Sequence, residues 1–366
     1  MSSLSATAGS IGKNFFSWLL DNRRASYGLA IMRISYGLMT LVTIALYLPN
    51  FSYTFGQGSR WGNALNDVSS VNNYPWPLPF PFSREDPDSL LMIKVLLLAI
   101  VTVLYILGWR MRITSPLFVY LWLGFTALNP VLTNSGHYQT LRVMLIIMLF
   151  ADLSRRWSLD ARRASKALEA GKAIKPPVIP KWFTNLLNNV AVILVGYQLC
   201  TIYVVSALWK LQGSTWMSGV AVYYPLQLEE LTIFPWLNEI LLSMTPVVFL
   251  ATWMSVYVQL LFPLMLLHRW TRIAGLILIT GMHIGIGVML AIPFFSLVMI
   301  AADMIFIRDK TWGRFETRVK EFGGRFLDRF RARSDTGGER KRKSTAPQGG
   351  RAETAEEQEV PQQQSS

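Results

Sequence analysis

The sequence predicts an all-α integral membrane protein, a polytopic helical bundle of about eight transmembrane helices. Apolar residues make up 52% of its 366 residues and the mean hydropathy is positive, more than a water-soluble domain of this length carries. Apolar runs long enough to cross about 30 Å of hydrocarbon recur along the chain. Basic residues gather in alternate loops between these runs, which is typical of a multi-pass protein.

The predicted spans follow one another with mostly short connections. They cover Ser26–Leu48, Leu90–Gly108, Thr114–Leu132, Tyr138–Leu153, Asn188–Leu208, Pro246–Leu267, Ile273–Leu290 and Phe294–Ile307. The fourth and the eighth are shorter than the others, and we expect them to tilt or to pack inside the bundle.

The distribution of lysine and arginine predicts the orientation of the spans, because short loops rich in both stay in the cytoplasm. The basic stretches are Arg23–Arg24, Arg110–Arg112, residues 155–181, Arg269–Arg272 and Arg308–Arg314. This pattern fits eight spans with both termini cytoplasmic, in a multi-pass protein of the cell membrane. The net charge of +13 then follows largely from topology, so we expect a lipid bilayer and no nucleic acid as partner.

Composition divides the chain into four parts. Residues 1–24 form a cytoplasmic N-terminal segment, and 25–312 form the transmembrane domain. Residues 313–333 alternate basic and apolar side chains, which predicts an amphipathic juxtamembrane segment on anionic lipid. Residues 334–366 contain almost nothing to bury, which predicts a disordered cytoplasmic tail.

Polar residues inside the predicted spans are few, and each is either paired or functional. Arg33 lies in the first span, and Asp303 in the last span is a candidate partner for it. His283 lies between glycines that permit close helix contact, where an imidazole can serve packing or chemistry. Arg142 can bind an acidic group or neutralise a carboxylate within the bundle. With one cysteine and three well-separated histidines, we expect no metal site.

Lys210 ends the fifth span, at the outer face of the membrane. A cation at that depth is costly to desolvate, so it is an interface anchor, a paired charge or a functional group. Desolvation beside Leu208, Trp209 and Leu211 would favour the neutral amine, which can accept a proton.

Several short motifs together resemble one family. They are Asn134–Tyr138, Trp157–Asp160, Ser206–Leu211 followed by Trp216, Gly219 and Tyr223–Tyr224, and Met282–His283 before Pro293–Phe294. In order and spacing they are similar to the HTTM (horizontally transferred transmembrane) domain family, over roughly Ala25 to Arg308. That family includes the membrane part of vitamin K-dependent gamma-glutamyl carboxylase.

The resemblance implies specific roles. Lys210 resembles the base that starts oxidation of a reduced quinone, and His137 resembles a histidine that assists carboxylation. A reduced quinone is then the implied cofactor, and the apolar walls beside Lys210 would receive it. We expect Arg142, His283, Trp209 and Tyr223 to bind substrate.

One departure from the carboxylase leaves a second hypothesis open. The outer loops, mainly Phe51–Asp88 and Gly213–Thr245, are too short to replace the large lumenal portion that binds the carboxylase's protein substrate. A lipid-soluble molecule or a small peptide is then the expected substrate. Alternatively, the chain is a non-enzymatic membrane maturation factor that binds a lipid, a small secreted peptide or a partner protein.

Overall fold

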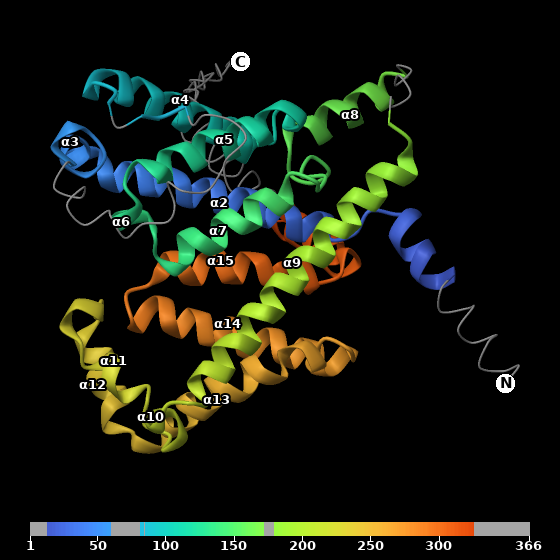
Figure 1. The fold of residues 1–366 in the computed structure, drawn as a ribbon. Helices are drawn as coiled ribbons and strands as arrows, with labels where there is room; N and C mark the ends of the chain where they lie inside the picture. Colours follow the sequence, from blue (N-terminus) through green and yellow to red (C-terminus); the bar gives the residue numbers. More distant parts are fainter. Residues whose placement is uncertain (1–12, 60–80, 84, 172–178, 326–366) are drawn as a thin grey trace, which may run out of the picture. The chain divides into compact units, whose positions relative to one another are not determined.

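The computed structural model describes residues 13–59, 81–83, 85–171 and 179–325. Within these residues every regular element is a helix, which confirms the predicted all-α class (Figure 1). The chain divides into two units, Met1–Lys310 and Thr311–Ser366. In the second unit residues 311–325 are helical. The remainder of the predicted amphipathic segment and the predicted disordered tail lie outside the described residues, as do residues 1–12 of the predicted N-terminal segment.

Six of the described helices are long and apolar enough to cross a membrane. They are α2 (Ser26–Tyr47), α4 (Asp88–Leu107), α5 (Met111–Leu128), α9 (Lys181–Lys210), α13 (Thr245–Met265) and α14 (Arg269–Met289). Each matches one predicted span. The two spans predicted to be short are α7 (Gly136–Met148), with 13 residues, and α15 (Pro293–Asp303), with 11.

Short helices connect the long ones. They are η1 (Leu48–Asn50), α3 (Phe51–Thr54), α6 (Pro130–Thr133), α8 (Leu159–Glu169), α10 (Ser214–Met217), α11 (Tyr223–Leu226), η4 (Glu229–Leu231), α12 (Pro235–Ser243) and η5 (Met304–Phe306). Proline occupies the first turn of α6, α12 and α15, where its missing N–H costs nothing. Helix α4 ends at Gly108, whose φ of 67° lies in the left-handed region that glycine adopts readily.

Helices α2, α15 and α9 organise the packing of the first unit. Helix α2 packs on α4 and α15, α9 packs on α13, and α14 packs on both α13 and α15 (Figure 1). Tyr36, Trp122, Leu141 and Val298 are fully buried in the resulting core. Gly28 allows α2 to approach η5 closely, because a Cβ there would lie 2.7 Å from the Cα of Ile305.

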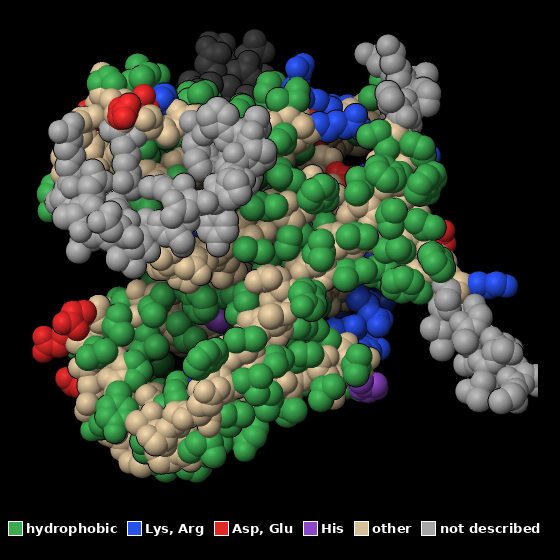
Figure 2. All heavy atoms as spheres, in the orientation of Figure 1, with side chains coloured by type: hydrophobic (Ala, Val, Ile, Leu, Met, Phe, Trp, Pro, Cys, Tyr) green, Lys and Arg blue, Asp and Glu red, His purple; other side chains and the backbone are tan. Residues whose placement is uncertain are grey.

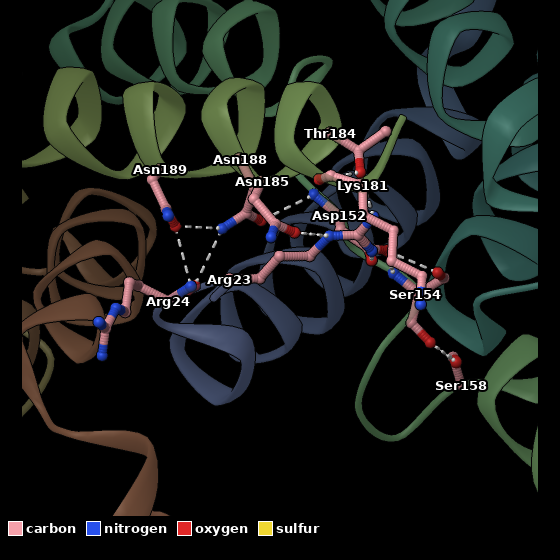
Figure 3. A network of polar contacts seen from close by, with 10 residues as sticks. All are labelled: Arg23, Arg24, Asp152, Ser154, Ser158, Lys181, Thr184, Asn185, Asn188 and Asn189. Carbon is pink, nitrogen blue, oxygen red and sulfur yellow. Dashed lines mark hydrogen bonds and ion pairs between the residues drawn. The ribbon is translucent and has the colours of Figure 1, made fainter. Parts of the chain in front are cut away.

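A polar network fixes the start of α9 against the segment that precedes α2 (Figure 3). Arg23 forms an ion pair with Asp152, which follows α7. The side chain of Asn189 accepts a hydrogen bond from the backbone N–H of Arg24 at 2.9 Å and donates one to the carbonyl of Leu19 at 2.8 Å. Asn189 is fully buried, so it replaces the water that these backbone groups would otherwise bind.

The predicted pair of Arg33 with Asp303 is wrong. The fully buried guanidinium of Arg33 donates to the backbone carbonyls of Leu153 and Trp157, at 2.5 and 2.6 Å. Asp303 instead accepts a hydrogen bond from Tyr203. The physical reason is that the chain leaves helical geometry after α7, and its buried carbonyls then need a donor from another element.

The contacts of Arg33 predict that its contribution to the free energy of unfolding is independent of Asp303. Arg33→Met should lower the free energy of unfolding by about 2–4 kcal/mol, because it leaves buried carbonyls without donors. In a double-mutant cycle with Asp303→Asn, the two effects should add within about 0.5 kcal/mol. Unfolding of the four proteins in mixed micelles measures this. A coupling energy well above about 1 kcal/mol would show that Arg33 and Asp303 interact directly and would contradict this prediction.

Candidate functional site

A cavity of about 730 Å³ lies where the ends of several helices meet in the first unit. Figure 2 shows the surface hollowed between α7 and the segment α10–α12. Helices α13 and α14 form a large part of its wall, and Leu290, Ile292 and Phe295 extend it where α14 leads into α15. The side chains of α13 and α14 are mainly apolar: Ala251, Met254, Val258, Leu278, Met282, Ile286 and Met289. The start of α7, the end of α9 and the segment α10–α11 complete it. A mainly apolar cavity with few polar groups is typical of a small-molecule site.

Lys210 reaches this cavity from the last position of α9. Its Nζ donates a hydrogen bond to Oε1 of Gln259 on α13 at 2.8 Å, and lies 4.8 Å from the ring centroid of Trp216. Lys210 makes no ion pair within the described ranges. The amine is therefore held by a neutral amide and an aromatic face, without a carboxylate to fix its charge.

His137 lines the same cavity from the start of α7. Its Nδ1 lies 2.9 Å from the hydroxyl oxygen of Ser135, and its ring stacks on Phe294 at a centroid distance of 5.8 Å. Nε2 then remains as the ring nitrogen that can bind a ligand.

A buried polar chain lies behind the cavity wall. The hydroxyl of Tyr203 donates to Oδ2 of Asp303 at 2.8 Å and lies 3.2 Å from Nε2 of His283. All three side chains are fully buried. Tyr203 lies about two helical turns before Lys210 and on the same face of α9, so one helix face carries both groups. His283 itself does not line the cavity, although its neighbours Met282 and Gly281 do.

The structure brings together two of the residues predicted for the site and leaves four outside the cavity wall. Lys210 and His137 share the wall, whereas Arg142, His283, Trp209 and Tyr223 do not line it. Trp209 is 70% exposed, because successive residues of a helix point about 100° apart and Lys210 faces inward. Tyr223 is 39% exposed, and Arg142 is half-buried on α7.

Three side chains of the site were missed from the sequence. Gln259 is a lone amide in an otherwise apolar span, and that isolation was a usable signal. Trp216 appeared only as part of a motif, and Tyr203 has no sequence signal that separates it from a core tyrosine. Among the described residues no three His, Cys, Asp or Glu side chains come together as metal ligands would.

The chain is similar in sequence to a known protein family and to two Bacillus subtilis proteins. The model of the HTTM domain family matches residues 22–312. Uncharacterized protein YitO of Bacillus subtilis (strain 168) is 25% identical over 215 residues, which cover 57% of this chain and 64% of that protein, less than two thirds of its length. Sporulation-delaying protein SdpB of the same organism is 26% identical over 287 residues, covering 76% of this chain and 80% of that protein. No solved structure matches the chain.

The buried chain predicts a stability cost at Tyr203. Tyr203→Phe should lower the free energy of unfolding by about 1–3 kcal/mol, because it removes the donor to Asp303 and leaves buried polar atoms unpaired. Tyr197→Phe on the same helix is the matched control, since Tyr197 is 67% exposed, and it should change little. Thermal unfolding of both variants in detergent micelles tests this. Equal effects of the two substitutions would refute it.

Proposed function

Because this chain belongs to the HTTM domain family, we propose that it is a membrane enzyme that removes a proton from a lipid-soluble or small peptide substrate, with Lys210 as the base. The observation that carries the proposal is the shared cavity. Lys210 and His137 lie on different helices, far apart along the chain, and both line one mainly apolar space of about 730 Å³. Such a space suits an apolar molecule with one or two polar groups.

The chain's own residues supply the requirements of a base. The apolar walls exclude water, which disfavours the charged ammonium and leaves Nζ of Lys210 with a lone pair to accept a proton. Gln259 Oε1 orients Nζ through its hydrogen bond. Nε2 of His137 can hold a second polar group of the substrate, since Nδ1 faces the hydroxyl of Ser135. Tyr203, His283 and Asp303 stabilise the adjacent wall from behind.

A reduced quinone fits this cavity as a cofactor. Met254, Val258, Leu278 and Ile286 would contact its ring and apolar tail, and Lys210 would contact a hydroxyl. When bound, a reduced quinone supplies acidic hydroxyl groups and reducing equivalents for a carboxylase-like reaction. The donor set of the wall suits that chemistry, because it contains an amine and an imidazole but no carboxylate among the described residues.

We also propose the cell membrane as location, with both termini in the cytoplasm. Six helices long enough to span support a multi-pass protein. The basic residues Arg23, Arg24, Arg155 and Arg272 belong to the end of the bundle opposite the Lys210 cavity, which fits the positive-inside rule. The cavity would then open on the outer half of the bilayer.

A second candidate function is a non-enzymatic maturation factor for a small secreted peptide, working with a partner protein. The relative whose match covers most of both chains supports a non-catalytic role, because it is named for delaying sporulation and not for an enzymatic activity. In that case the cavity would hold an apolar group of the peptide without changing it chemically. The two functions differ in one measurable respect, which is turnover.

The proposed base makes a direct prediction for Lys210. Lys210→Ala should slow the oxidation of a reduced prenylated naphthoquinone by dissolved dioxygen, catalysed by the nanodisc protein, about 100-fold or more, the usual contribution of a positioned base. In the unaltered protein, the same quinone should protect Lys210 from an amine-labelling reagent, as read by mass spectrometry. Protection arises because the bound ring excludes the reagent from the cavity.

Lys181→Ala is the control, since Lys181 begins the same helix and is exposed. Turnover by Lys181→Ala should equal that of the unaltered protein. In the unaltered protein, the quinone should not change the labelling of Lys181. A folded Lys210→Ala protein with full turnover would remove Lys210 from the mechanism. Protection of Lys210 by a quinone that is recovered unchanged after prolonged incubation would instead support the binding factor.

A further inference from the structure

A groove of about 850 Å³ runs beside α9, toward the end of the bundle opposite the Lys210 cavity. None of its lining residues lines that cavity. Its floor and one wall are apolar and include Ile193, Gly196, Leu266 and Phe306. Ile193 is 41% exposed, so this wall is open at the side of the bundle, where a bilayer would lie. The groove therefore offers the apolar contact that an acyl chain needs.

The rim of the groove is strongly basic. Arg24, Arg272, Arg308 and Lys310 line it, and none of them forms an ion pair within the part of the chain that the structure describes. Because Arg272, Arg308 and Lys310 line one groove, their like charges repel one another. An anion is the usual partner that relieves such repulsion.

Two carboxylates near this rim offset only part of its charge: Asp309, which lines the groove with one negative charge against four cations, and Asp152, which pairs with Arg23. The carboxylate of Asp309 accepts the backbone N–H groups of Ser26 and Tyr27, at 3.1 and 3.0 Å, and so caps the start of α2. Arg23 is neutralised by Asp152 (Figure 3). By contrast, Nε of Arg24 is buried and has no hydrogen-bond partner among the described residues. The guanidinium of Arg24 lies over the ring of Trp18, 5.7 Å from its centroid, so the aromatic side chain holds this cation at the rim.

We infer that this groove binds one anionic phospholipid, with the phosphate at the arginine rim and an acyl chain along the apolar wall. Charge complementarity selects an anionic headgroup, because four cations, Arg24, Arg272, Arg308 and Lys310, line the groove with one carboxylate, that of Asp309. The apolar wall selects a lipid over a soluble phosphate, which would gain nothing from Ile193, Leu266 and Phe306. The inference goes beyond the proposed function, since it concerns a separate groove and does not require turnover.

The test uses the full chain in micelles, with native mass spectrometry to count bound lipids after addition of phosphatidylglycerol or phosphatidylcholine. One phosphatidylglycerol should be retained, at least about tenfold more tightly than phosphatidylcholine. The double variant Arg24→Gln/Arg272→Gln should lose this preference. Arg162→Gln/Lys166→Gln, which removes two exposed cations of α8, is the charge-matched control and should keep it.

A second variant separates a lipid from a soluble anion. Gly196→Leu leaves the rim charges intact and projects a side chain into the groove, where a Cβ already meets Phe306 at 3.4 Å. It should weaken phosphatidylglycerol binding several-fold. Equal retention of the two lipids by the unaltered protein would overturn the inference. Displacement of the lipid by millimolar inorganic phosphate, together with no effect of Gly196→Leu, would assign the rim to a soluble anion and also overturn it.

Discussion

The structure depends on one constraint: a polar group buried among membrane helices must find its partner inside the protein. Water is absent from the hydrocarbon region, and an unpaired group there costs several kcal/mol. Arg33 satisfies the constraint with backbone carbonyls, Asn189 with the segment before α2, and Tyr203 with Asp303. Each of these contacts joins elements that are far apart along the chain, so together they set how the helices pack.

Helix α9 runs from one end of the bundle to the other and is held by such polar contacts along its length. Its 30 residues are held at the start by asparagines in the polar network and in the middle by Tyr203. Its last residue, Lys210, is then placed against Gln259 on α13. Because the helix is anchored at three levels, the position of the amine is determined by contacts well outside the cavity. This rigidity is what a general base or a selective binding site requires.

The first unit contains two sites that differ in their charged side chains. The cavity beside Lys210 is mainly apolar, and its described lining includes one amine and one imidazole, which suits uncharged or weakly acidic molecules. The groove beside α9 carries Arg24, Arg272 and Arg308, which form no ion pair among the described residues, over an apolar wall, and this suits an anionic lipid. Figure 2 shows most of its blue Lys and Arg side chains on the α8 and α9 side of the view and most of its red Asp and Glu side chains on the other side.

The sequence by itself determined the helical membrane class, the six long spans and the two short ones, and it singled out Lys210 and His137 as candidates. It could do so because apolar length, loop charge and short motifs are local properties of the chain. Only the tertiary structure decided that Lys210 and His137 share a cavity, that Gln259 holds the amine, and that Trp209 points away. It also showed that Arg33 and Asp303, predicted as a pair, have different partners: Arg33 donates to the carbonyl of Leu153, and Asp303 accepts from Tyr203. Partner choice depends on helix rotation and crossing, which many distant side chains fix together, and no local pattern encodes it.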